Sequence, residues 1–269
     1  MFIAKYEAKK SKLAGTLSGM SGTGVAEKER SPFRESFLEA WRCIAQGRYE
    51  AAGARFVQLQ SRFPGSSDVA QGLAWARLLQ GRVEEGRVLM TPVVGETMPH
   101  FWPVVRQIAE EATDAKNAGE TIPRTAGEAL LLSYAALRDE NAEEAVRLTR
   151  LAESWLPGNG FVVANVATAL GFAQKYDEAI ALLHTVLQTF GTPAMWHNLG
   201  LCEFQRGNSA GAREAFHRSL ALLPGYDVPL WALATLEWKA KHFGAAFQYA
   251  RAAMKARKQI RERAKKEPQ

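Results

Sequence analysis

Small residues recur along this chain at a nearly constant spacing, and this repetition constrains the fold more than any other feature. Four alanines follow one another at intervals of 34, 33 and 34 residues, namely Ala145, Ala179, Ala212 and Ala246. Ala52 and Gly86 are also 34 residues apart. A period of roughly 20 to 50 residues indicates a copied and stacked supersecondary unit, because one copy cannot bury its apolar face alone.

The clearest copy runs from Met195 to Pro224 and contains the pattern of two helices. Three residues share one face of the first helix at spacings of three and four, namely Trp196, Leu199 and Gly200. Gly207 then interrupts the helical pattern. Ala212 and Phe216, four residues apart, begin the inner face of a second helix, which Pro224 ends. We expect a pair of antiparallel helices that approach each other closely at the small residues.

This pattern resembles the tetratricopeptide repeat, W-x2-L-G-x2-Y, then A-x3-F, then P. The matching residues are Trp196, Leu199, Gly200, Ala212, Phe216 and Pro224. Glu203 stands where the family has tyrosine, and Phe204 follows one residue later. The resemblance implies an all-α fold, a right-handed superhelix of stacked helix–turn–helix repeats. In such a superhelix the first helix of each pair lines the concave face, and the second faces outward.

The spacing also predicts how the chain is divided. From Gly86 to Ala145 it is 59 residues, 25 more than one period and too few for another repeat. We therefore predict a flexible basic, Gly- and Ser-rich N-terminal segment (1–30), two repeats (31–98), an irregular helical insertion (99–125), four repeats (126–257) and a basic C-terminal tail (258–269). The last second helix continues beyond Arg257, which is typical of a capping helix with a polar outer face.

Charge and cysteine usage limit the class of protein. The net charge is +6, and residues 251–269 alone hold eight Lys or Arg against two Glu, so the rest of the chain is balanced. Cys43 and Cys202 lie in different repeats, which predicts two reduced, buried thiols rather than a disulfide framework. The sequence shows neither an apolar run of about 18 residues nor a secretory h-region. We expect an intracellular, cytoplasmic protein without a membrane span.

The sequence lacks the patterns of the common enzyme classes. It contains no H-E-x-x-H, no G-x-S-x-G and no Walker sequence. None of the five histidines pairs with a neighbour at metal-ligand spacing. The prediction is a protein without catalytic residues, cofactor or bound metal.

The predicted binding site is the concave face, where twelve residues of the first helices should lie. They are Phe37, Trp41, Gln71, Trp75, Tyr134, Arg138, Phe161, Phe172, His197, Phe204, Trp231 and Trp238. Aromatic side chains on a concave surface are typical anchors for a partner, although aromatic residues on helices also serve as core. The set favours a scaffold or adaptor that holds an apolar or amphipathic peptide of another protein.

Two other functions stay open at this point. An aromatic groove is similar to that of small bacterial chaperones for secreted hydrophobic proteins. Alternatively, the basic ends could contact nucleic acid or another anionic surface weakly, and such a contact should weaken steeply with salt. The partner and the oligomeric state are not predicted.

Overall fold

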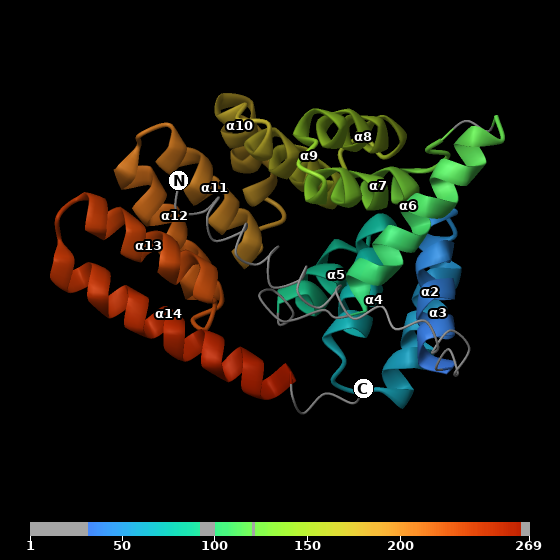
Figure 1. The fold of residues 1–269 in the computed structure, drawn as a ribbon, viewed down its shortest axis with the longest axis horizontal. Helices are drawn as coiled ribbons and strands as arrows, with labels where there is room; N and C mark the ends of the chain where they lie inside the picture. Colours follow the sequence, from blue (N-terminus) through green and yellow to red (C-terminus); the bar gives the residue numbers. More distant parts are fainter. Residues whose placement is uncertain (1–31, 92–99, 120–121, 265–269) are drawn as a thin grey trace, which may run out of the picture. The chain divides into compact units, whose positions relative to one another are not determined.

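The computed structural model of the protein describes residues 32–91, 100–119 and 122–264, so the prediction for residues 1–30 lies outside them. These ranges form thirteen α-helices and contain no β-strand (Figure 1). The helices are α2 (Pro32–Ala45), α3 (Tyr49–Arg62), α4 (Ser67–Leu79), α5 (Val83–Met90), α6 (Phe101–Asn117), α7 (Ala126–Arg138), α8 (Ala142–Trp155), α9 (Gly160–Phe172), α10 (Tyr176–Leu187), α11 (Pro193–Gln205), α12 (Ser209–Leu222), α13 (Asp227–Lys239) and α14 (Phe243–Ala264). The predicted all-α architecture of helix–turn–helix repeats is confirmed.

The chain divides into two compact units, Met1–Glu35 and Ser36–Gln269, and the contacts described below lie within the second. No helix among the described residues has both the length and the apolar character needed to cross a bilayer.

Each pair of helices closes with the same kind of turn. One residue in every turn has a left-handed φ, and these residues are Gly47 (73°), Gly81 (77°), Glu140 (60°), Gln174 (61°), Gly207 (85°) and Lys241 (63°). After α11, the Gly207 amide donates to the Phe204 carbonyl at 3.1 Å, and the Asn208 amide donates to the Glu203 carbonyl at 2.9 Å. This closure satisfies carbonyls that a helix end leaves without partners. A shared turn repeats the same geometry from pair to pair.

The small residues lie where the paired helices cross. A Cβ added to Gly200 would lie 2.5 Å from Cε1 of Phe216, and one added to Gly86 would lie 2.3 Å from Cγ of Leu78. Ala212 is fully buried at the crossing of its own pair. The close approach predicted from the spacing is therefore present, and a larger side chain there would displace its neighbour.

The C-terminal pairs stack in chain order. Helix α8 packs against α9, α10 against α11 and α12 against α13, so each second helix contacts the first helix of the following pair. The N-terminal pairs begin in the same manner, with α3 packed against α4.

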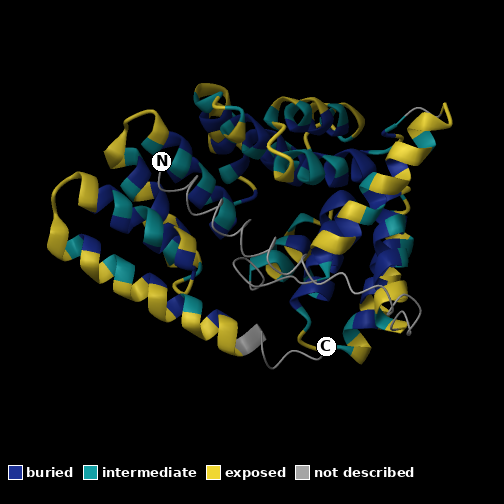
Figure 2. Ribbon diagram, in the orientation of Figure 1, coloured by how far each residue is buried: buried dark blue, intermediate teal, exposed yellow. Residues whose placement is uncertain are grey.

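The two N-terminal pairs meet the later ones in a different way, through the ends of their first helices. Thr125 caps the start of α7, and its Oγ1 donates to the carbonyl of Ala45 at the end of α2, at 2.6 Å. Asn159 caps the start of α9 one period later, and its Nδ2 donates to the carbonyl of Leu78 near the end of α4, at 2.9 Å. The end of α2 thus meets the start of α7, and the end of α4 meets the start of α9 one period later. Figure 2 shows α4, α7 and α9 largely buried.

The predicted insertion contributes helix α6, which joins these two groups. The buried carboxylate of Asp68, in α4, accepts the backbone N–H groups of His100 and Phe101 at 3.3 and 2.9 Å. This cap satisfies donors at the start of α6 and fixes it on α4. Helix α6 also packs against α7. The insertion is therefore part of the core rather than a separate loop.

The outer face of the last helix is only partly polar: it is polar beyond Arg257, as predicted, and carries apolar residues before it. Phe243, Phe247 and Met254 of α14 are 54%, 71% and 53% exposed. Figure 2 shows exposed residues along much of this helix. Periodicity located the helix, but it cannot tell an outward apolar residue from an inward one when both faces contain apolar positions.

Candidate functional site

The twelve residues predicted to line a groove fall into three groups that differ in how far they are buried. Six are buried: Phe37, Trp41, Gln71, Trp75, Phe161 and His197. Three are partly buried, namely Tyr134, Phe204 and Trp231, and three are exposed, namely Arg138, Phe172 and Trp238. Their role in binding stays a prediction, but burial decides which of them a partner can reach.

Five aromatic residues meet where the N-terminal pairs contact the later ones, and we name them the aromatic junction: Trp41 of α2, Trp75 of α4, Phe101 of α6, Tyr134 of α7 and Phe161 of α9. The Trp75 ring lies 5.3 Å from Trp41, 5.3 Å from Tyr134 and 5.1 Å from Phe161, measured between centroids. Trp41 lies 5.1 Å from Phe101. These separations are typical of favourable tilted and edge-to-face aromatic pairs.

Four of the five residues of the aromatic junction are buried, and Tyr134 is partly buried. Trp41 is fully buried and Trp75 is 1% exposed. Burial also raises the pKa of the Tyr134 phenol to about 12, because the phenolate would lack water. A peptide could reach these rings only if the helices separated. We therefore interpret the N-terminal part of the predicted groove as a packed contact between helix pairs.

Three aromatic members of the set lie at the ends of three consecutive first helices, and the exposed Arg138 ends the first helix before them, α7. Phe172 is the last residue of α9, Phe204 is next to last in α11, and Trp238 is next to last in α13. Phe172 is 64% exposed and Trp238 is 63% exposed. Phe204 and Trp238 are 34 residues apart, one period, whereas Phe172 lies one position beyond Gly171, which is 33 residues before Phe204. We name Phe172, Phe204 and Trp238 the aromatic ladder.

Phe204 contacts a lysine on one side and a buried core cluster on the other. The Lys239 ammonium lies 4.4 Å from the centroid of the Phe204 ring, within the range of a cation–π contact. Phe204 and Leu201 pack on a core cluster that includes Phe216. Trp231 packs instead against a buried cluster of α13 and α14 residues. Within the ladder, Phe204 is thus held on a buried core with a cation over its ring.

His197 lies inside the fold and not on an open surface. Its ring is 5.6 Å from Phe216 and 5.8 Å from Tyr226, and its Nδ1 has no hydrogen-bond partner among the described residues. Burial lowers the pKa of His197 to about 4, so the imidazole is neutral at pH 7. It therefore presents no charge to a partner.

A shallow trough of about 480 Å³ lies between α6 and α7, where the sequence pattern was least regular. The guanidinium of Arg138 stands 5.3 Å from the centroid of the Trp102 ring, and both residues line the trough. The rest of its lining is of mixed charge, with Arg106, Glu110, Asp114 and Asp139. Sequence reasoning missed Trp102, although a tryptophan beside Phe101 at a helix start is a visible signal.

The thiols and acids give no reactive centre within the described part of the chain. Cys43 and Cys202 are buried and not bonded to each other, as predicted. Burial, with the Glu203 carboxylate nearby, raises the pKa of Cys202 to about 11, which makes its thiolate scarce. No group of three His, Cys, Asp or Glu residues in these ranges could hold a metal ion.

The comparison with protein families identifies the class. The family model described as Tetratricopeptide repeat matches residues 167–227, from within α9 to the start of α13. The match includes the copy whose residues carry the resemblance, and the predicted family is confirmed. Over these residues the chain is similar to the tetratricopeptide repeat family.

Comparison with solved structures gives distant neighbours, and no curated protein matches the sequence. A crystal structure of MamA is 13% identical with a TM-score of 0.46, over 61% of this chain and 92% of that one. PilF of Pseudomonas aeruginosa is 21% identical with a TM-score of 0.45, over 71% and 76%. A chain of the Cut9–Hcn1 hetero-tetramer of the APC/C is 13% identical with a TM-score of 0.49, over 87% and 49%. We take no conclusion about binding from likeness this distant.

Proposed function

We propose that this protein is a non-enzymatic scaffold that binds an apolar or amphipathic segment of another protein along the aromatic ladder. Tetratricopeptide repeats bind other proteins and are in general non-catalytic. The observation that carries the proposal is the position of Phe172, Phe204 and Trp238. Each lies at the end of one of three consecutive first helices; Phe172 and Trp238 are exposed and Phe204 is partly buried.

The chemistry of the ladder supports an apolar anchor with an acidic neighbour. Large, rigid aromatic side chains give much contact area for little lost conformational entropy. Lys239 adds a positive charge beside Phe204. A bound segment would therefore place apolar side chains on the rings and a carboxylate near the ammonium.

The other functions stay predictions. A chaperone for a secreted hydrophobic protein would use the same surface, and only the identity of the partner separates it from a scaffold. Weak contact with polyanions would use the basic C-terminal residues, and a cytoplasmic location is a further prediction. Binding through the ladder should change little with salt, whereas phosphate contacts weaken steeply.

The test begins with a pull-down on the intact protein and identification of its partner by mass spectrometry. The dissociation constant is then measured for Phe172→Ala and Trp238→Ala. Loss of a central anchor should weaken binding by about 2 kcal/mol, roughly 30-fold. Val88→Ala on α5 is the matched control, because Val88 is also apolar and 63% exposed. Unchanged affinity in both ladder variants would refute the proposal.

A further inference from the structure

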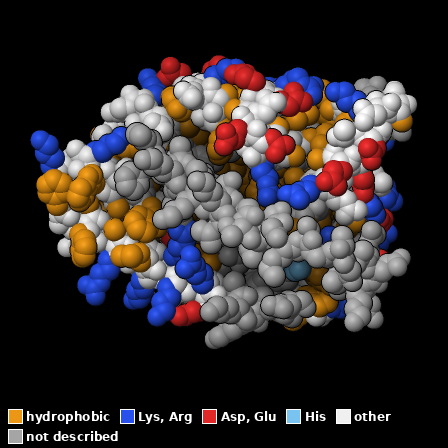
Figure 3. Space-filling view, in the orientation of Figure 1, with side chains coloured by type: hydrophobic (Ala, Val, Ile, Leu, Met, Phe, Trp, Pro, Cys, Tyr) orange, Lys and Arg blue, Asp and Glu red, His pale blue; other side chains and the backbone are white. Residues whose placement is uncertain are grey.

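The outward face of α14 carries apolar residues that are more than half exposed, although the Phe243 ring also packs against Trp238, with 4.9 Å between ring centroids. Phe243, Phe247 and Met254 lie four and seven residues apart, which places them on one stripe of the helix. Phe247 is 71% exposed, more than either exposed residue of the aromatic ladder. Figure 3 shows hydrophobic side chains gathered where α13 and α14 meet, with cations along the edge of α14.

Helix α12 is the second helix of the preceding pair, and its corresponding face packs against the helices that follow it. Arg213 Nη2 lies 2.7 Å from Oε1 of Glu237, in α13. The His217 ring lies 6.2 Å from the ring of Tyr249, in α14. Leu220 packs against clusters built from α13 and α14. All three α12 residues therefore contact the pair of helices that follows.

The same positions on α14, 34 residues later, are Phe247, Arg251 and Met254. Ala212 and Ala246 are related by the same interval and are both buried, so the register holds between the two helices. The α14 face, which we define as Phe247, Arg251, Met254 and Lys255, thus corresponds to the surface on which α12 holds the next helices.

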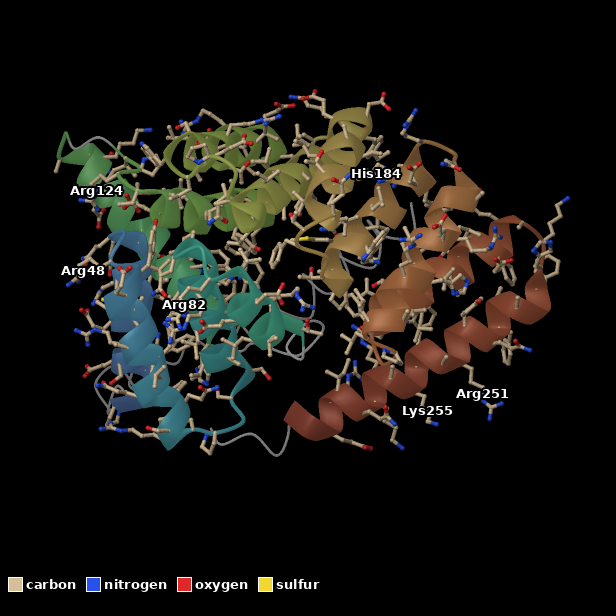
Figure 4. All side chains as sticks on the ribbon, turned by 180° about the vertical axis from the view of Figure 1, so that it is seen from behind. Arg48, Arg82, Arg124, His184, Arg251 and Lys255 are labelled. Atoms are coloured by element: carbon tan, nitrogen blue, oxygen red, sulfur yellow. The ribbon has the colours of Figure 1, made fainter. Side chains whose placement is uncertain are left out.

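Charge indicates what kind of helix would fit. Arg251 and Lys255 project from α14 away from α13 (Figure 4), and neither has a carboxylate partner among the described residues. Lys258, one turn beyond, is 3.8 Å from Glu262. A two-fold pairing of α14 with a second copy of itself would bring these cations together, which Coulomb repulsion disfavours.

We propose that the α14 face docks an amphipathic helix of another protein that places apolar side chains on Phe247 and Met254 and acidic side chains beside Arg251 and Lys255. The docked helix continues the stack as the first helix of a next pair would. The four residues of this site are distinct from those of the aromatic ladder, although Phe243, one turn before Phe247, contacts Trp238 of the ladder. Its occupant is recognised by a helical apolar face with acidic flanks.

The experiment uses the full chain and two fluorescein-labelled synthetic helical peptides. Both have leucines along one face, and their flanking residues are glutamates in one peptide and lysines in the other. Fluorescence anisotropy should show binding of the glutamate peptide, with the lysine peptide at least about tenfold weaker. Phe247→Glu should weaken the glutamate peptide at least about tenfold. The double variant Arg251→Glu/Lys255→Glu should shift the preference toward lysine.

Two controls separate this site from other surfaces. Val88→Glu places the same charge at an exposed apolar position on α5 and should leave the affinity unchanged. Phe172→Ala, which should weaken the partner of the aromatic ladder, should also leave the affinity of the glutamate peptide unchanged. If Phe172→Ala alone abolished binding, the peptide would occupy the ladder and the proposal for α14 would be wrong.

Three further results would overturn the proposal. One is equal affinity for the two peptides, or no measurable binding of either. Another is a protein that is dimeric by sedimentation and becomes monomeric in Phe247→Glu, which would show that a second copy covers the face. The last is that single-stranded DNA displaces the peptide and binds wild type and Phe247→Glu equally well. Arg251 and Lys255 would then form a site for a polyanion and not for a helix.

Discussion

Trp75 and Trp238 are both tryptophans of a first helix, at different positions along it, and their surroundings are opposite. Trp75 is 1% exposed within the aromatic junction, whereas Trp238 is 63% exposed in the aromatic ladder. The difference lies in what contacts each helix. The ends of α2 and α4 meet α7 and α9 through the Thr125 and Asn159 caps. Helices α11 and α13 end without such a contact among the described residues. The same residue type is therefore core in one region and accessible surface in the other.

The largest expected effect concerns stability. Trp75→Ala should lower the free energy of unfolding by about 3–5 kcal/mol, because it leaves a cavity among four aromatic rings. Trp238→Ala should cost less than about 1 kcal/mol, because most of its side chain already contacts water. Denaturant unfolding of the two variants measures the difference. Equal losses would show that the two regions do not differ in packing.

Stability should fall at acid pH because of His197, a buried residue of α11, the helix that also carries Phe204 of the aromatic ladder. Its pKa is about 4 in the folded protein and about 6.5 when unfolded, so the unfolded state binds more protons between these values. This contribution is complete above about pH 6.5 and is lost as the pH falls toward 4, by about 3 kcal/mol at most.

The control for this prediction is His197→Phe, which cannot titrate. Unfolding free energies of wild type and variant are compared at neutral pH and at the acid end of the window. Wild type should lose more stability than the variant. Parallel losses would mean that His197 is accessible to water, and that the accessible region extends deeper than the ladder.

The contact between α2 and α7 can be broken at one glycine. A Cβ on Gly127 would lie 2.1 Å from the carbonyl oxygen of Ile44, a backbone atom that cannot move aside. Gly127→Ala should cost about 1–3 kcal/mol in unfolding free energy. Gly244→Ala in α14 is the control, since nothing lies within 4 Å of the added atom. If both variants had wild-type stability, the N-terminal pairs would not be held tightly against α7.

The smallest expected effect comes from the turns. Gly47 and Gly81 occupy the left-handed position in the N-terminal pairs, whereas Gln174 has a φ of 61° at the same position later in the chain. Gln174→Gly should stabilise the protein by about 0.5–1 kcal/mol, because glycine adopts this conformation without steric cost. Thermal unfolding measures the gain. A loss of stability would show that the Gln174 side chain makes contacts that outweigh its backbone strain.

The repeats were predictable from sequence because they depend on local spacing. Ala52, Ala145, Ala179 and Ala212 are all fully buried at their crossings, as the period requires. The turns and the helix pairs follow from the same pattern, since nearby residues set both.

The packing of the N-terminal pairs onto α7 and α9 was not predicted, because it joins residues far apart in the chain. An apolar inner face satisfies the periodic pattern whether a peptide or another helix covers it. One signal was present: residues 160–172 contain no charged side chain. A helix that is apolar all round is buried over most of its surface, as α9 is except at Phe172, its last residue. Reading α9 in this way would have placed Phe161 in a core before the structure did.

The central claim, that Trp75 is core and Trp238 is binding surface, can be tested in one measurement. Fluorine NMR on protein containing 5-fluorotryptophan, with resonances assigned by Trp75→Phe and Trp238→Phe, reports the solvent contact of each ring through its shift between H2O and D2O. The resonance of Trp238 should move with solvent and again when a partner binds, while that of Trp75 should move in neither case. A solvent shift of Trp75 as large as that of Trp238 would contradict the account, because the aromatic junction would then be open to water.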